Sequence, residues 1–451
     1  MNVWTQGSCA FCIAIQTMAA EPDPAALHRT PLATGLSEPI ALDVSPDGRA
    51  WMAERRGAIK VWDPLSGAVR EVGRLQVFTG PEDGILGMVL DPGFGTNHWL
   101  YLYHSTPGIL ENHLSRFTVR GDALDPASQK ILLSVPTRIP KPNHSGGGLD
   151  FDHQGNLYLG VGDYTVVGDS DGFAPLDERP GRALHDSQRT ASNTDDLHGK
   201  ILRIHPEPDG SVSIPTGNLF PPGTPRTRPE VFVMGVRNPF RLAVDRTTGR
   251  LLWGDVGPDA LVADAGRGPA GFDEFNVTRS AGNFGWPYFS ADNRAYVAFD
   301  FATRKSGATF DAARPRNTSP NNTGLHDLPP ARPAMLWYPP GFSTRWPVLG
   351  SGARSAMAGP VCRPETAAPR RWPARYDGAV VLWDWERGRI WAAWLDAADH
   401  LERIEAIASQ DRFLRPIAAR FAPDGALLVL EWGSNWADNR DAALVRVAPA
   451  P

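Results

Sequence analysis

Short segments in which apolar and polar residues alternate recur along the chain, and tight turns join them in pairs. Alternation with a period of two is typical of β-strands that bury one face. A Gly in the turn supplies the positive φ that a hairpin needs. The clear copies are residues Ile40–Glu54, Gly148–Gly162, Arg241–Asp255 and Ala418–Glu431, and the looser ones are Leu86–Tyr103 and Tyr376–Leu395.

These repeated hairpins predict the fold. One hairpin cannot bury both of its faces alone, so regularly spaced copies indicate sheets that stack and close on one another. We therefore predict an all-β fold, a six-bladed β-propeller with long rim loops, in which residues 28–451 form one domain. The polar stretches 168–197 and 290–346 are too long for hairpin turns and are expected to be excursions on the rim.

Composition agrees with this fold and excludes some classes of function. The chain has 451 residues with Gly 45, Pro 42 and Trp 15, as expected of a turn-rich β protein with a well-filled interior. The net charge is −5 and there is no basic tract, so nucleic acid is not an expected partner. No apolar run reaches the roughly 18 residues of a membrane helix, so we predict no membrane span.

The first residues resemble a targeting segment. Residues 9–20 are apolar and end in small residues, like the rear of a secretory signal. We predict that residues 1–27 are a leader or a disordered segment and that the protein is periplasmic or secreted. Cys9 and Cys12 could instead be a metal or redox pair, although no second pair accompanies them. Removal of the leader would leave Cys362 alone, without an intrachain disulfide.

The candidate chemistry starts at one histidine. His144 stands in Asn-His-Ser-Gly-Gly-Gly, where a loop enters a strand, and Asp163 follows the second strand of the same hairpin. A histidine held by a carboxylate is the usual arrangement for taking a proton from a hydroxyl. The alternative is an ordinary histidine in a surface loop.

Further motifs occur in order along the chain. They are Glu82–Phe94, Leu197–Ile204, Gly235–Pro239, Gly254–Asp259, Asp273–Asn276, Gly282–Pro287 and Pro423–Gly425. With the His144 segment, they resemble the soluble PQQ-dependent glucose/sorbosone dehydrogenase family, six-bladed propellers that use pyrroloquinoline quinone (PQQ) and calcium. The chain looks closest to the branch often found beside ThuA-like or cytochrome modules.

The resemblance implies an oxidoreductase that acts on a sugar or polyol hydroxyl. It gives His144 the role of general base and Asp163 the role of orienting it. Arg237 and Asn238 match the pair beside the reactive quinone carbonyl, where a guanidinium would stabilise negative charge. The alternative for Arg237 is a structural ion pair. A cytochrome or a quinone is the implied electron acceptor.

The resemblance also implies the cofactor contacts. Glu82 and Arg415 join His144, Arg237 and Asn238 as residues expected to bind PQQ. Calcium is expected on the backbone carbonyls of two residues, Gly257 and Pro258. A second calcium is expected at Asp273, Glu274 and the carbonyl of Phe284. For the Gly-Pro pair the alternative is an ordinary turn.

The chain departs from the family pattern at three positions. Glu82 stands where the family has glutamine, Glu386 where a basic residue is expected, and Ile417 where a second arginine is expected. PQQ is a tricarboxylate, so an acid in place of a cation should weaken its binding. The arginines that could substitute are Arg387, Arg389, Arg412 and Arg420.

These departures keep two other functions open. One is a catalytically impaired propeller that acts as a carbohydrate-binding module. The other is a calcium-dependent hydrolase of the lactonase type, since a fold does not fix a function. Aromatic residues in the long loops could stack on a sugar or simply pack the rim. They are Trp286, Tyr288, Trp337, Tyr338 and Trp346.

Overall fold

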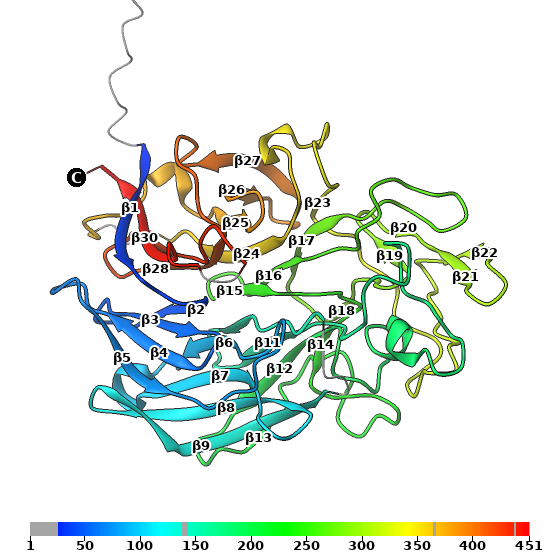
Figure 1. Ribbon diagram of the computed structural model, residues 1–451, viewed down its shortest axis with the longest axis horizontal. Coiled ribbons are helices and arrows are strands. Elements are labelled where there is room, and N and C mark those ends of the chain that lie inside the picture. The colour runs from blue at the N-terminus through cyan, green and yellow to red at the C-terminus, as the bar shows by residue number, and fades with distance from the viewer. Residues whose placement is uncertain (1–25, 138–142, 364–366, 437–438, 451) are drawn as a thin grey trace, which may run out of the picture.

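The computed structural model describes residues 26–137, 143–363, 367–436 and 439–450, and these form a ring of sheets (Figure 1). The predicted six-bladed propeller is confirmed, because six sheets with four main antiparallel strands each surround one axis. Neighbouring sheets contact one another through their innermost strands. From the axis outward, the first three blades are β2 (Pro39–Val44), β3 (Ala50–Glu54), β4 (Ala58–Trp62) and β5 (Val69–Arg74); β6 (Ile85–Leu90), β7 (Trp99–Ser105), β8 (Glu111–Arg120) and β9 (Ala123–Pro136); and β10 (Leu149–Phe151), β11 (Leu157–Val161), β12 (Lys200–Pro206) and β14 (Val231–Met234).

The remaining blades follow the same plan. They are β15 (Arg241–Asp245), β16 (Arg250–Asp255), β17 (Asp273–Thr278) and β23 (Leu336–Tyr338); β24 (Ala356–Val361), β25 (Val380–Asp384), β26 (Arg389–Leu395) and β27 (Leu401–Ile407); and β28 (Pro416–Phe421), β29 (Leu427–Glu431), β30 (Ala443–Pro449) and β1 (Leu27–Thr34). Short elements lie between them: α1 (Phe94–Asn97), β13 (Val212–Ser213), β18 (Gly282–Asn283), β19 (Phe289–Ser290), β20 (Arg294–Ala295), β21 (Val297–Asp300), β22 (Lys305–Thr309), and four 3-10 turns at Ala183–His185, Ser187–Arg189, Pro347–Leu349 and Ala374–Tyr376.

The blades form because each strand buries an apolar side against the next sheet. Trp51, Trp253 and Trp383 each lie on the second strand of a blade and are almost fully buried. Large rings at these positions fill the space between neighbouring sheets. The predicted turn chemistry is also present, since Gly48 and Gly425 have φ of 83° and 87°.

One repeat lies on different strands from the others. The clear copies and the copy Leu86–Tyr103 fall on the first and second strands of their blades. The copy Tyr376–Leu395 falls on β25 and β26, the second and third strands of its blade. The innermost strand there is β24, and a long connection rather than a hairpin turn follows it. The alternating pattern therefore became visible only one strand later.

The ring is closed by the two ends of the described chain. β1 pairs antiparallel with β30, from Leu27 opposite Pro449 to Thr34 opposite Ala443. Arg29 donates two hydrogen bonds to the carboxylate of Glu431, at 2.8 and 2.6 Å. The predicted leader, with Cys9 and Cys12, lies almost wholly outside the described residues. Among the described residues, no helix is long and apolar enough to cross a membrane.

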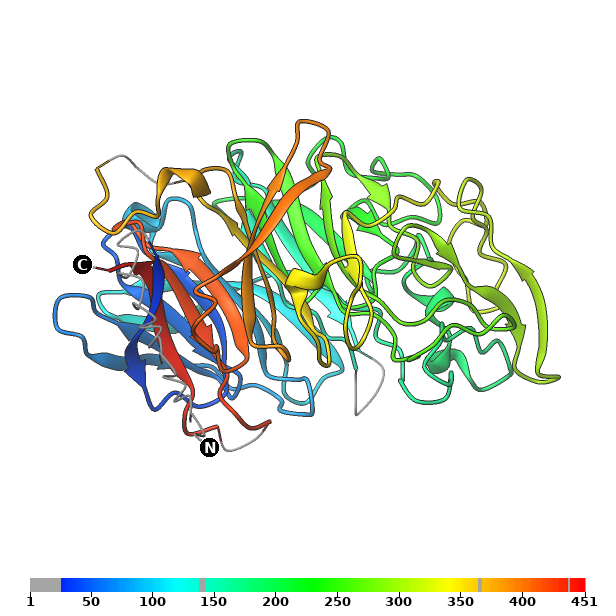
Figure 2. The same cartoon turned by 90° about the horizontal axis from the view of Figure 1, so that it is seen from above.

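The two long insertions lie together beside the ring, at the side of the third and fourth blades (Figures 1 and 2). One connects β11 to β12 and the other connects β17 to β23. Of the loop aromatics, Trp286, Tyr288, Trp337 and Tyr338 are buried. Their burial favours rim packing over an open sugar-stacking surface.

Candidate active site

The propeller brings the predicted residues to one end of the ring. The innermost strands of all blades run in the same direction because the blades repeat one connection pattern. His144, Asn238 and Arg415 each precede an innermost strand, whereas Asp163 follows the second strand of its blade. The loops that precede innermost strands and the loops that follow second strands lie at the same end of a propeller. Residues far apart in the sequence therefore become neighbours.

The His144–Asp163 pair is formed in the structure. Nδ1 of His144 lies 2.6 Å from Oδ1 of Asp163, and both side chains are buried. Asp163 also accepts hydrogen bonds from the Ser187 hydroxyl at 2.7 Å and the Trp286 indole N–H at 2.8 Å. Burial by itself would raise the pKa of Asp163, but His144, Arg237 and the hydroxyl donor together lower it to about 2.

This setting fixes the tautomer of the histidine. Asp163 is ionised at neutral pH, and an ionised carboxylate can only accept hydrogen bonds. Nδ1 of His144 therefore carries its proton and donates it to Asp163. The lone pair is left on Nε2, which is the atom able to take a proton from a hydroxyl.

The backbone at His144 is held in an uncommon conformation. Its φ is 64°, in the left-handed region that non-glycine residues seldom adopt. The Glu82 carboxylate accepts the backbone N–H groups of His144 at 2.6 Å and Ser145 at 3.2 Å. On the other side, a Cβ on Gly162 would lie 1.9 Å from the His144 carbonyl oxygen. The histidine loop therefore requires glycine at 162 and an acceptor at 82.

Arg237 and Asn238 reach the same place from the next blade. The backbone N–H of Asp163 donates to the carbonyl of Arg237 at 2.7 Å. Asp255 accepts the backbone N–H groups of Arg237 at 3.0 Å and Asn238 at 2.6 Å. The Arg237 guanidinium donates to the Val256 carbonyl at 2.8 Å, so the ion pair considered as its alternative role is not what holds it.

A small cavity joins Arg237 to the residues predicted to bind calcium. Gly257, Pro258, Glu274 and Phe284 all line it. Glu274 is half-buried, and its carboxylate accepts hydrogen bonds from the Ala291 backbone N–H and the Ser290 hydroxyl. Removal from water raises the pKa of Glu274 to about 8, and burial raises the pKa of the neighbouring Asp255 to about 7.

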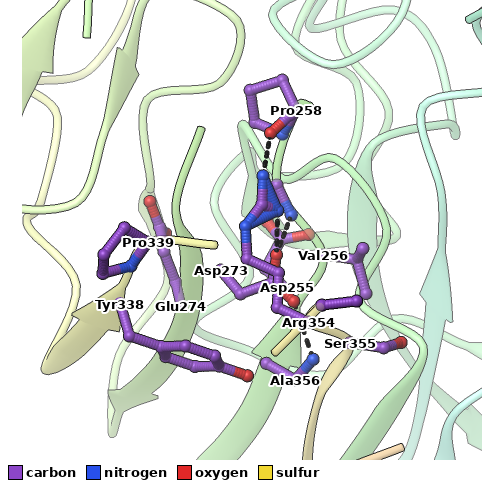
Figure 3. A network of polar contacts seen from close by, with 12 residues as sticks. Asp255, Val256, Pro258, Asp273, Glu274, Tyr338, Pro339, Arg354, Ser355 and Ala356 are labelled. Atoms are coloured by element: carbon purple, nitrogen blue, oxygen red, sulfur yellow. Dashed lines mark hydrogen bonds and ion pairs between the residues drawn. The ribbon is translucent and has the colours of Figure 1, made fainter. Parts of the chain in front are cut away.

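The Gly257–Pro258 loop does not fit calcium as it is built. The Arg354 guanidinium donates a hydrogen bond to the Pro258 carbonyl and pairs with Asp273 at 2.8 Å (Figure 3). A positive side chain thus occupies one of the two expected carbonyl ligands, that of Pro258, and the neighbouring carboxylate. Within the described ranges, no group of three or more His, Cys, Asp or Glu side chains is arranged to hold a metal.

Arg415 does not line this cavity and lies on the loop before β28. Its guanidinium donates to the Ser434 carbonyl, lies 4.8 Å from the Trp385 ring centre and is 3.8 Å from Glu386. Ile417 is buried among apolar residues and offers no charge.

The arginines considered as substitutes differ in how they are placed. Arg387 is saturated by backbone carbonyls, including those of Pro339 and Gly341. Arg420 lies 3.5 Å from Asp43 and donates to the Leu149 carbonyl, whereas Arg389 and Arg412 are exposed. Neither Arg387 nor Arg420 is therefore free to replace the cation missing at Glu386.

Sequence reasoning missed several residues that support the histidine pair. Ser187 comes from an irregular insertion that carries no pattern. Trp286 was considered only as an aromatic surface, although it lies in one of the quoted motifs. Lys200 donates to the carbonyls of Thr190, Ala191 and His198 and so fixes the loop behind Asp163. Burial lowers the pKa of Lys200 to about 7.

Proteins of known structure share this fold. The fold is that of dehydrogenase propellers, for example the PQQ-bound form of aldose sugar dehydrogenase from Streptomyces coelicolor, with a TM-score of 0.59 and 20% identity over 94% of this chain and 99% of that chain. At this identity the likeness concerns the fold alone. The sequence profile of the Glucose / Sorbosone dehydrogenase family matches residues 36–315, more than half of the chain. The chain belongs to this family.

Individual relatives are distant. Quinoprotein glucose dehydrogenase B of Acinetobacter calcoaceticus is 26% identical over 435 residues, which cover 88% of this chain and 83% of that protein. The uncharacterised protein slr1608 of Synechocystis is 28% identical over 275 residues. That match spans 58% of this chain and only 60% of the relative.

Proposed function

We propose that this protein oxidises a hydroxyl group of a sugar or polyol, with PQQ as hydride acceptor and His144 as general base. The observation that carries the proposal is the buried His144–Asp163 pair, 2.6 Å apart, at the end of the ring where the loop of Arg237 meets it. The family to which the chain belongs supports the same reaction class.

Each side chain has a defined task in this proposal. His144 takes the hydroxyl proton at Nε2, because Asp163 holds the proton on Nδ1. Asp163 stays ionised and stabilises the imidazolium that results. When PQQ is bound, it supplies the hydride acceptor. With PQQ bound, Arg237 and Asn238 would lie beside it, and the Arg237 guanidinium would stabilise negative charge on the acceptor.

The residues present fit an anionic, planar group at this end of the ring. The side-chain oxygen of Asn238 is buried and has no hydrogen-bond partner among the described residues, so it can accept a hydrogen bond from an N–H or O–H group of a ligand. Arg237 and Arg415 supply positive charge for carboxylates. Glu82 is already engaged by two backbone N–H groups, so its place beside the cofactor is that of a support for His144.

Calcium at the Gly257–Pro258 loop is not part of the proposal, because Arg354 occupies its carbonyl. Although both oxygens of Asp273 already accept N–H groups, the second calcium expected at Asp273, Glu274 and Phe284 stays a prediction. So do a cytochrome or quinone as electron acceptor and a periplasmic or secreted location, since the leader lies outside the described residues.

The test is reconstitution. The purified protein is titrated with PQQ and assayed for dye reduction with a panel of aldoses and polyols. We expect saturable PQQ binding and turnover with at least one sugar, and an Arg237→Ala variant should bind PQQ more weakly. Absence of PQQ binding at micromolar concentrations would refute the proposed function.

One observation favours a second candidate, a carbohydrate-binding module without turnover. The Arg415 guanidinium lies near Glu386, which reduces the charge available to a tricarboxylate. Sugar binding measured by calorimetry without PQQ-dependent turnover would support this candidate. The hydrolase alternative has no supporting observation.

A further inference from the structure

The Arg354 side chain joins two neighbouring blades at the loop expected to hold a metal. It precedes β24, whereas Pro258 follows β16 and Asp273 begins β17. The guanidinium donates through one nitrogen to the Pro258 carbonyl and through the other to Asp273 (Figure 3). The side chain of Arg354 is 5% exposed and that of Asp273 is 0% exposed. The contact is therefore an interior one.

Three oxygen atoms at this point, those of the Pro258 carbonyl and the Asp273 carboxylate, already accept hydrogen bonds. Oδ1 of Asp273 accepts from Arg354 at 2.8 Å and from the Gly257 N–H at 3.0 Å, and Oδ2 accepts from the Ala356 N–H at 2.8 Å. Calcium requires six to eight oxygen ligands with free lone pairs. A cation cannot approach oxygens at which N–H groups are already directed.

The surrounding backbone is shaped for this contact. A Cβ on Gly271 would lie 1.7 Å from the Pro258 oxygen and 2.5 Å from the Arg354 guanidinium. A Cβ on Gly257 would lie 1.7 Å from the carbonyl oxygen of Phe272. Both glycines let the two segments approach closely enough for one planar guanidinium to span the carbonyl and the carboxylate.

We propose that the guanidinium of Arg354 takes the place of a divalent cation at the Gly257–Pro258 loop. The protein supplies this positive charge from its own chain and needs no calcium there. The inference does not depend on the proposed function, because it concerns how the loop is held and applies whether or not PQQ binds.

The test exchanges the guanidinium for calcium. The melting temperature of the PQQ-free protein is measured with excess calcium, with excess magnesium and with a chelator. For the wild type we expect no difference between these conditions. The Arg354→Gln variant should melt lower in chelator and regain several degrees with calcium, because removal of the guanidinium frees the Pro258 and Asp273 oxygens. Magnesium, which is smaller and keeps its waters, should restore less.

Two controls separate this replacement from the loss of any buried ion pair. Arg250 pairs with Asp399 at 2.6 Å and is also buried, so Arg250→Gln should lose stability without any calcium response. Arg354→Lys keeps a positive charge in place and should also be insensitive to calcium.

Several results would overturn the inference. One is a calcium-dependent rise in the melting temperature of the wild type as large as that of Arg354→Gln. Another is an Arg354→Gln variant that calcium does not stabilise, or one that folds neither with calcium nor without it. An Arg354→Gln variant that folds only with calcium would support the replacement. Because PQQ is absent throughout, failure of the proposed function would not change these results.

Discussion

Two carboxylate centres lie near each other in this propeller, and they have opposite electrostatic properties. At the first, Asp163 is held by His144, Ser187 and Trp286, and its pKa is lowered to about 2. At the second, the pKa values of Asp255 and Glu274 are raised to about 7 and about 8. Removal from water favours the neutral form of all three groups, so burial alone does not explain the difference.

The groups that surround each carboxylate explain the difference between the pKa values. Asp163 has a histidine that can carry charge, the nearby Arg237 and two side-chain donors, which together outweigh the cost of leaving water. Glu274 has a backbone N–H, two neutral side-chain donors and another carboxylate nearby, which do not outweigh that cost. The first centre is suited to holding a fixed charge beside a base, whereas the second is suited to holding a proton near neutral pH.

Removal of the base at the first centre should have the largest effect on turnover. His144→Gln should lower turnover of the reconstituted protein about 10²–10⁴-fold, because the imidazole that takes the hydroxyl proton is lost. His400, which pairs with Asp396 on an exposed turn, is the matched control, and His400→Gln should leave turnover unchanged. Equal turnover of wild type and His144→Gln would show that His144 is not the base.

A smaller change moves the histidine without altering its chemistry. Gly162→Ala places a methyl group against the His144 carbonyl and should cost about 1–3 kcal/mol of unfolding free energy, with a loss of turnover. Gly95→Ala is the control, because no atom lies within 4 Å of its added Cβ. Urea unfolding and steady-state assays measure both effects. A Gly162→Ala variant as stable and active as wild type would contradict the close approach.

The dependence of stability on acidic pH tests the lowered pKa of Asp163. Its pKa is about 2 in the folded protein and about 4 when unfolded, so its contribution to stability is present above pH 4. Asp163→Asn should therefore cost about 2 kcal/mol at pH 7, and the cost should shrink as the pH falls from 4 toward 2. A difference from wild type that is constant over this range would contradict the lowered pKa.

The contribution of Glu274 to stability should change with pH in the opposite direction. Its pKa rises on folding, so the folded protein binds an extra proton between about pH 4 and pH 8, and wild-type stability falls as the pH rises through that range. Glu274→Gln keeps an acceptor for the Ala291 N–H and removes the titration. We expect the variant to gain about 1.4 kcal/mol per pH unit relative to wild type between pH 5 and pH 8. Parallel stability curves would rule out the raised pKa.

The sequence predicted those parts of the molecule whose cause is local. Hairpin turns, strand alternation and the His144 motif are each written within a few neighbouring residues, and the ring and the His144–Asp163 pair follow from them. Arg354 could not be predicted this way, because it meets Asp273 and Pro258 only through the packing of two blades. Ser187 likewise reaches Asp163 from an insertion without periodicity. The Tyr376–Leu395 repeat falls on the second and third strands of its blade, because no hairpin turn follows β24.

The closure of the last blade has a consequence for how the chain is made. Among the described strands, β1 is synthesised first and its partner β30 last. Until β30 has emerged, the edge of β1 therefore stays open to mispairing, and this sheet can form only after the strands of the other five blades have been made. Ring completion, rather than formation of individual hairpins, is then the late event of biogenesis.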